Sequence, residues 1–79
     1  MTLKQLEYFL AIAENGSITK AANSLRISQP PLSLQLKGLE EELGCRLFAR
    51  KPSFELTYSG KCFQKAAVKL LDIQHQTEA

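Results

Sequence analysis

Side chains that could support catalysis or bind a metal ion are few in this chain. His75 is the only histidine among the 79 residues. The three glutamates at 40–42 are consecutive, so in a helix they point in successive directions and do not face one another as an acid pair. Cys45 and Cys62 lack CxxC or Cys/His ligand spacing and are expected to be reduced thiols. We therefore predict no enzyme activity, no metal site and no cofactor.

The stretch SQPPLSLQL at residues 28–36 offers a different chemistry, the recognition of DNA bases, provided that it forms a helix. Glutamine can read an adenine edge, serine can reach a base or a phosphate, and apolar atoms can contact a thymine methyl group. A proline inside a helix costs about 3 kcal/mol, but in the first turn its missing N–H would have had no partner. The helix must therefore begin directly before the prolines.

The leucines that follow indicate that this helix forms. They lie four, three and four residues apart on one helical stripe: Leu32, Leu36, Leu39 and Leu43. Ser28 is the expected N-cap, accepting a hydrogen bond from a first-turn amide, and Gly44 ends the helix. A polyproline ligand is the alternative interpretation, but the segment has no PxxP pattern and the leucine stripe follows at once.

The opposite side of this helix is mostly polar in its N-terminal half. It carries Pro30, Ser33, Leu34, Lys37 and Glu41, with Gln29 at the margin. A recognition helix that enters the DNA major groove by its N-terminal end has this arrangement. Leu34 is either an ordinary exposed leucine or a contact for thymine methyl groups or sugar.

The neighbouring segments would hold this helix in place. A first helix over about 2–14 places Leu3, Leu6, Leu10 and Ala13 on one face and ends at Asn15-Gly16. Ser17 caps a short helix over about 18–25, and a tight turn at 26–27 completes a helix-turn-helix. After Gly44, strand candidates at 46–50 and 54–56 flank a turn at 51–53 and form a small basic hairpin.

A final helix, capped by Thr57, has an apolar face too broad for one small domain to cover. Its members are Phe63, Ala66, Ala67, Leu70, Leu71 and Ile73. Homodimerisation is the economical explanation, although packing on a domain absent from this chain would give the same pattern. The predicted fold is mainly α with a small β-hairpin: a winged helix-turn-helix over 1–57 and a linker and dimerisation helix over 58–79.

Charge is unevenly distributed, although the net charge is only +2. Residues 17–37 contain three cations and no acid, and residues 46–69 contain six cations and one acid. Such segments favour a surface that meets phosphate, with a solvated charged face as the alternative. No apolar run is long enough to span a membrane, and the N-terminus does not resemble a signal peptide, so the expected location is the cytoplasm.

Five motifs follow one another along nearly the whole chain: SITKAA at 17–22 with Leu25, SQPPLS at 28–33, LEEELG at 39–44, LFAR at 47–50, and LT at 56–57 with Gly60. Together they resemble the N-terminal domain of LysR-type transcriptional regulators. The resemblance implies a winged helix-turn-helix, a long fourth helix that pairs in a homodimer, and binding to interrupted palindromes in double-stranded DNA at bacterial promoters. The family's small-molecule-binding domain has no counterpart here, so an effector would act only through a missing C-terminal domain.

The resemblance also implies roles for single residues, with bases near Gln29, Pro30 and Ser33. The complete set of expected DNA-binding residues is Ser17, Lys20, Ser28, Gln29, Pro30, Pro31, Ser33, Leu34, Lys37, Arg50, Lys51 and Ser53. Two positions depart from the family pattern. Leu34 stands where Arg or Lys is usual, so an arginine–guanine contact is lost. Gly38 replaces a residue that is commonly polar or basic.

The leading hypothesis is sequence-specific DNA binding by a homodimer. The recognition helix at about 28–43 would lie in the major groove and the wing at about 46–56 on the flanking groove. The alternative is a helical protein-interaction module that binds a partner through its last helix. The absence of acids from 17–37 favours DNA, since an interaction module has no need of it.

Overall fold

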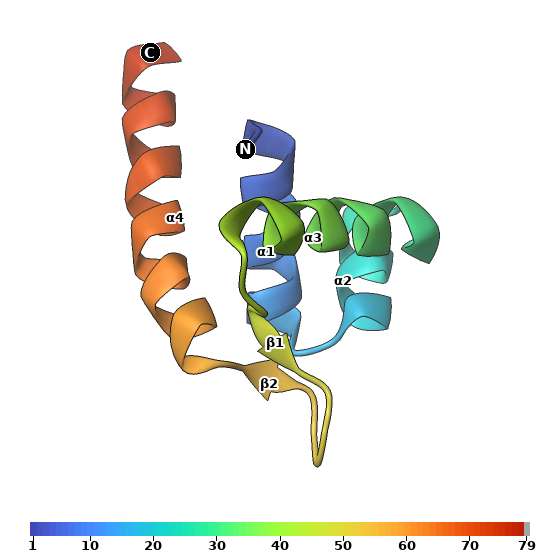
Figure 1. The fold of residues 1–79 in the computed structure, drawn as a ribbon. Coiled ribbons are helices and arrows are strands. Elements are labelled where there is room, and N and C mark those ends of the chain that lie inside the picture. The colour runs from blue at the N-terminus through green and yellow to red at the C-terminus, as the bar shows by residue number, and fades with distance from the viewer. Residues whose placement is uncertain (79) are drawn as a thin grey trace.

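Over residues 1–78, which the computed structural model describes, the fold consists of four α-helices and one two-stranded antiparallel hairpin (Figure 1). In chain order the elements are α1 (Leu3–Asn15), α2 (Ile18–Leu25), α3 (Gln29–Leu43), β1 (Phe48–Ala49), β2 (Glu55–Leu56) and α4 (Tyr58–Glu78). The predicted class, mainly α with a small β-hairpin, is confirmed.

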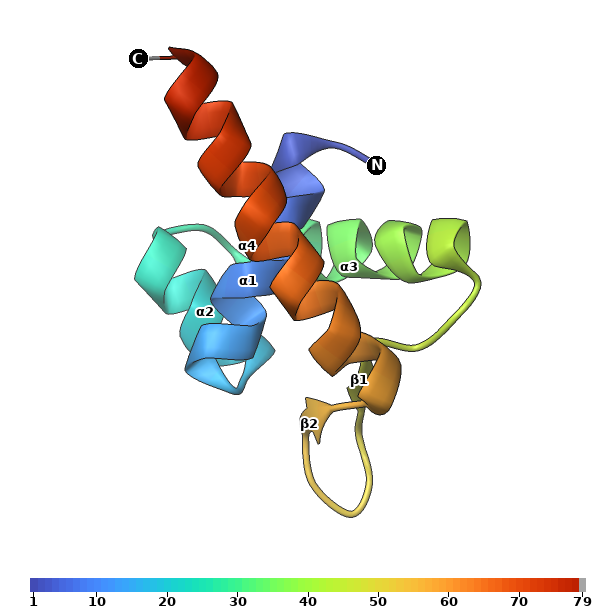
Figure 2. The same ribbon diagram turned by 90° about the vertical axis from the view of Figure 1, so that its left-hand side faces the viewer.

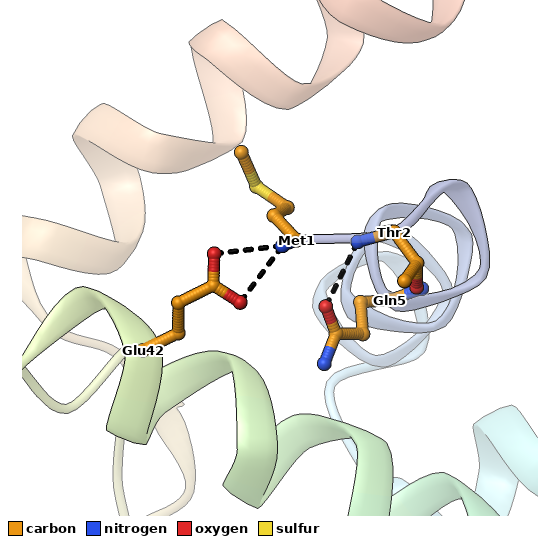
Figure 3. A network of polar contacts seen from close by, with 4 residues as sticks. All are labelled: Met1, Thr2, Gln5 and Glu42. Carbon is orange, nitrogen blue, oxygen red and sulfur yellow. Dashed lines mark hydrogen bonds and ion pairs between the residues drawn. The ribbon is translucent and has the colours of Figure 1, made fainter.

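The start of α1 is fixed by a capping box and by the amino terminus. The Thr2 side chain accepts a hydrogen bond from the Gln5 backbone N–H at 3.1 Å, and the Gln5 side chain accepts one from the Thr2 N–H at 2.9 Å. This reciprocal pair satisfies two backbone donors that have no partner within the helix. The Met1 ammonium group donates to both carboxylate oxygens of Glu42, at 2.8 and 2.7 Å, which ties the amino terminus to the end of α3 (Figure 3).

The turn between α2 and α3 is set by one residue in a left-handed conformation. Arg26 has φ 58°, and its N–H donates to the carbonyl groups of Ala22 and Asn23. The next N–H, that of Ile27, donates to the Ala22 carbonyl at 3.0 Å. These bonds satisfy the last carbonyls of α2 within two residues. The predicted helix-turn-helix and its tight turn at 26–27 are confirmed.

The hydrophobic core lies where the other three helices cover α1. Figure 2 shows α4 running across α1, with α3 extending away to the side. The largest fully buried side chains are Phe9, Ile12, Leu32, Leu39 and Leu47. The predicted face of α1 is wrong at its start, since Leu3 in the first turn is 40% exposed, and Leu43 in the last turn of α3 is 37% exposed. Both leucines lie in terminal turns, beyond the region where the helices cover one another.

Four phenylalanines form an aromatic run from α4 through α1 to the hairpin. The Phe9 ring lies between that of Phe63, at 5.1 Å between centroids, and that of Phe48, at 5.5 Å. Phe48 in turn stacks on Phe54 at 4.9 Å. These separations are in the range of favourable aromatic pairs. The run therefore links the position of the hairpin to α1 and α4.

The hairpin strands are shorter than the segments predicted at 46–50 and 54–56, since pairing is limited to β1 and β2. The backbone before β1 is bonded elsewhere. The Leu47 N–H donates to Glu40 Oε2 at 2.7 Å, and the Leu47 carbonyl accepts from the Thr57 N–H at 3.0 Å. Because these groups are bonded to α3 and to the start of α4, they are not available to a strand ladder.

Thr57 caps α4, as predicted. Its Oγ1 accepts from the Gly60 N–H at 2.9 Å and donates to the Arg46 carbonyl at 2.7 Å. Gly60 and Ala67 are buried, and Phe63 packs against the core between them. The start of α4 therefore packs through these three residues on the core formed by the preceding elements.

A Gly38→Ala variant is expected to be more stable than the wild type by about 1 kcal/mol, since glycine is about that much less favourable than alanine inside a helix. Gly38 lies within α3, and a Cβ added there would lie 3.4 Å from Gln5 Nε2, an ordinary contact. Urea unfolding followed by circular dichroism measures the difference. A lower unfolding midpoint would show instead that the Gln5 side chain cannot make room.

Candidate nucleic-acid interface

The outer face of α3 carries the side chains predicted to read DNA. Leu34 is 68% exposed, Gln29 and Lys37 are also exposed, and Ser33 is half-buried. Leu32, on the opposite side, is fully buried. The predicted division of this half of α3 into a buried stripe and an exposed face is confirmed.

The start of α3 is exposed, but its capping differs from the prediction. Ser28 makes no side-chain capping hydrogen bond. A capping side chain accepts from the second or third helical amide, and in α3 these residues are Pro30 and Pro31, which have no N–H. Because Ser28, Pro30 and Pro31 are exposed and the helix does not use the Ser28 hydroxyl, this end presents a polar group and two rigid rings outward.

The side chain of Gln29 is oriented by α2. Its Nε2 donates a hydrogen bond to Thr19 Oγ1 at 3.2 Å. The amide keeps its Oε1 acceptor and a second N–H donor. An acceptor and a donor on one amide are the pair that recognises adenine through N6 and N7. Thr19 therefore holds the amide without using the groups that would read a base.

Two other predicted contacts lie at the start of α2. Ser17 Oγ accepts a hydrogen bond from the Lys20 N–H at 3.2 Å, so Ser17 caps α2. The Ser17 hydroxyl can still donate its own hydrogen, for example to a phosphate oxygen. Lys20 is exposed one residue after Thr19, the partner of Gln29. These residues continue the exposed polar surface from α3 onto α2.

A concave surface lies between α3 and the hairpin. Its lining residues are Ser33, Lys37, Glu40, Glu41, Gly44, Cys45, Arg46 and Arg50. Its three cations form no ion pair with any part of the chain that the structure describes. The carboxylate of Glu40 accepts the Leu47 N–H, so part of its charge is directed at the backbone. A phosphate group could approach the cations of this surface.

The hairpin carries the predicted wing residues. Lys51 and Ser53 are exposed in the loop between β1 and β2, which extends away from the helices (Figure 1). The Arg50 guanidinium lies 5.9 Å from the centre of the Phe54 ring, within the range of a cation–π contact. Phe54 belongs to the aromatic run, so the core positions the Arg50 guanidinium in the wing.

The residues predicted to form a dimer lie on two sides of α4. Phe63, Ala67 and Leu71 pack against the core of their own chain. Ala66, Leu70 and Ile73 are exposed, Leu70 by 41% and Ile73 by 57%. The second group is exposed, Phe63 and Leu71 keep part of their surface exposed, and Ala67 is buried. Within residues 1–78, no helix is long and apolar enough to cross a membrane.

Sequence reasoning did not identify three residues that shape this surface. Thr19 orients Gln29, Arg46 adds a cation to the concave surface, and Glu40 fixes the backbone before the hairpin. Spacing gave no signal for Thr19 or Glu40, because each contact crosses a turn between elements. The position of Arg46, close to Arg50 in a basic segment, was a usable signal.

Two helices joined by a tight turn, the second with an exposed reading face, and a cationic hairpin beside it define a winged helix-turn-helix protein of the DNA-binding class. Comparison of the sequence with protein families assigns the chain to one family within that class. Residues 3–61 match the family described as "Bacterial regulatory helix-turn-helix protein, lysR family", and the chain belongs to this family.

Curated relatives agree with this assignment. The chain is 51% identical over 73 residues to the HTH-type transcriptional regulator BsdA of Bacillus subtilis, covering 90% of this chain and 25% of BsdA. It is 50% identical over 72 residues to the regulator BudR of Klebsiella aerogenes, covering 90% of this chain and 50% of BudR. The chain thus spans between a quarter and a half of the length of these relatives.

Solved structures of DNA complexes have the same fold. The BenM_DBD/catB site 1 DNA complex matches with a TM-score of 0.92 and 46% identity, covering 98% of this chain and 84% of that one. The CbnR_DBD-DNA complex matches with a TM-score of 0.93 and 38% identity, covering 99% and 91% of the two chains. The DNA belongs to those two structures, which show that domains of this fold bind double-stranded DNA.

Proposed function

We propose that the chain binds specific sites in double-stranded DNA as the DNA-binding part of a LysR-type transcriptional regulator. The observation that carries this proposal is the reading face at the start of α3, where Gln29 is held by Thr19 with an acceptor and a donor unused. Lys37, Arg46 and Arg50, which line the concave surface next to it together with Glu40 and Glu41, supply cations for the phosphate backbone. The DNA complexes of BenM and CbnR domains support the same assignment.

In this proposal, α3 enters the major groove by its N-terminal half. Gln29, Pro30 and Ser33 approach base edges, and Lys37 approaches the backbone. The acidic end of α3 at 40–42 stays outside the groove, since carboxylates there would be repelled by phosphates. Arg50 and its neighbours in the hairpin loop then meet the flanking groove. Ser17, Lys20, Ser28 and Pro31 would contact the backbone beside it.

The proposed form on DNA is a homodimer that binds an interrupted palindrome. The exposed apolar residues of α4, Ala66, Leu70 and Ile73, are the surface available for a second copy. The chain spans only part of its relatives. A small-molecule effector would act through a further C-terminal domain. We also propose a cytoplasmic location, where the chromosome lies, and no enzyme activity, in keeping with relatives that are transcriptional regulators.

The test is selection of bound duplexes from a randomised pool, followed by fluorescence-anisotropy titration of the enriched sequence at about 50 and about 200 mM salt. A palindrome with arms about one helical turn apart is expected. The logarithm of the affinity should fall with the logarithm of salt by about 0.9 for each phosphate neutralised. No enrichment and no binding at the lower salt would refute the proposal.

A Gln29→Ala variant is expected to bind the enriched site more weakly by about 1–3 kcal/mol, because it loses a bidentate contact to a base.

A Lys51→Ala variant should weaken binding to the enriched site and to a random duplex equally and lower the salt slope, because Lys51 meets phosphate. Anisotropy titrations of both variants against both duplexes measure the difference. Equal losses on the two duplexes for Gln29→Ala would mean that Gln29 reads no base.

A further inference from the structure

The reading face of α3 contains a leucine with no packing role. Leu34 is 68% exposed, whereas four other exposed leucines, Leu3, Leu25, Leu43 and Leu70, are 37–41% exposed. It is directed away from the core. Its neighbours three and four residues away on the helix surface are the exposed Pro30 and Pro31 on one side and Lys37 and Gly38 on the other.

Leu34 lies between two proposed DNA contacts along the axis of α3. It lies five residues after Gln29 and three before Lys37, about 7.5 Å and about 4.5 Å along the axis at 1.5 Å per residue. If Gln29 reads a base edge and Lys37 reaches the backbone, the exposed Leu34 side chain comes within reach of the base edges between them.

The chemistry of the groove floor selects one base for such a side chain. The thymine C5-methyl group is the apolar group that a base presents in the major groove. Guanine instead presents the N7 and O6 acceptors and cytosine an amino group. A leucine over those groups would exclude water from them without replacing its hydrogen bonds, which is unfavourable. Leu34 therefore both favours thymine and disfavours guanine and cytosine.

We propose that Leu34 is a specificity-determining residue that selects thymine, through its methyl group, at one position of each half-site. This inference rests on the proposed function, since it assigns a base to the same reading face. Its test removes a single methyl group from the DNA. Uracil pairs as thymine does but lacks that methyl group, so each thymine of one half-site is replaced in turn by deoxyuridine.

Wild-type protein is expected to bind about threefold to fivefold more weakly when the critical thymine becomes uracil, the effect of burying one methyl group. The Leu34→Ala variant should bind both duplexes within about 1.5-fold of each other, because the methyl group has lost its partner. Lys51→Ala is the matched control and should keep the full uracil penalty. Because Leu34 is exposed, its replacement should leave the unfolding midpoint unchanged, which confirms that the variant is folded.

Two outcomes would overturn the inference, and they differ in what else they affect. If a sequence is enriched but no uracil penalty depends on Leu34, Leu34 does not select thymine and the proposed DNA-binding function stands. If no sequence is enriched by the wild type, the proposed function fails and this inference fails with it. Uracil penalties of equal size in the wild type and in Leu34→Ala would likewise show that Leu34 does not select thymine, and the proposed DNA-binding function would stand.

Discussion

A Gly60→Ala variant is expected to lose about 3 kcal/mol of folding stability, at the upper end of what overpacking usually costs. A Cβ added to Gly60 would collide with the backbone carbonyl of Leu47 and lie 2.9 Å from Leu56 Cδ2. Backbone cannot rotate aside as the end of a long side chain can. The clash must therefore move α4 or the segment before β1.

The energetic consequence extends beyond the clash itself. The Leu47 carbonyl accepts the Thr57 N–H at 3.0 Å, and Thr57 Oγ1 accepts the Gly60 N–H at 2.9 Å. Moving α4 outward would strain the bond between Thr57 and Leu47, which joins the segment before β1 to the start of α4. Those Gly60→Ala molecules that remain folded should bind DNA more weakly than the wild type, because their hairpin would be poorly placed.

Urea unfolding of Gly60→Ala beside Gly38→Ala tests the argument directly. Both variants make the same chemical change, and helix propensity favours it by about 1 kcal/mol at the interior position 38 and does not oppose it in the first turn of α4 at position 60. Close packing reverses the sign only at position 60. If Gly60→Ala unfolds at the wild-type urea concentration or above, then α4 does not approach Leu47 as closely as the structure indicates.

The sequence predicted most of the local structure because its helix start and stop signals are clear. Gly16 and Gly44 follow α1 and α3 in the left-handed conformation, and Ser17 and Thr57 cap α2 and α4. Each of these signals depends on a few neighbouring residues. Local chemistry is sufficient to fix them, so they can be read without knowing the fold.

The cap of α3 could not be predicted by the same rule. Ser28 has the right residue type and the right position, but its usual donors are missing because Pro30 and Pro31 occupy them. The predicted hydrogen bond from a first-turn amide to the Ser28 side chain is absent from the structure. A helix that begins with fixed proline φ angles can form without this cap.

Contacts between elements are the part that the sequence did not predict. The glutamates at 40–42 look equivalent as a run, but they have different roles once the chain is folded. Glu40 bonds the Leu47 N–H and Glu42 bonds the Met1 ammonium group. The broad apolar face of α4 likewise gave no indication of which side would cover α1. Helical periodicity defines a face and not its partner.

The largest loss of stability is expected for Phe9→Ala, at about 3–5 kcal/mol, the usual range for removing a buried phenylalanine ring. Phe9 is fully buried, and its ring contacts those of Phe48 and Phe63 at 5.5 and 5.1 Å. A domain of this size typically has a total stability of about 4–12 kcal/mol. The loss is therefore a large fraction of the total stability, and at the lower end of that range the variant would be largely unfolded.

Urea unfolding at low temperature, with Phe9→Leu as the control, measures this effect. Leucine refills much of the volume but restores neither aromatic pair, so its loss should be less than half that of alanine. In both variants the fluorescence anisotropy of bound DNA should fall in proportion to the folded fraction. A loss below about 1 kcal/mol for Phe9→Ala, outside the usual range, would mean that the packing of Phe9 contributes less to folding than its burial and its two aromatic contacts indicate.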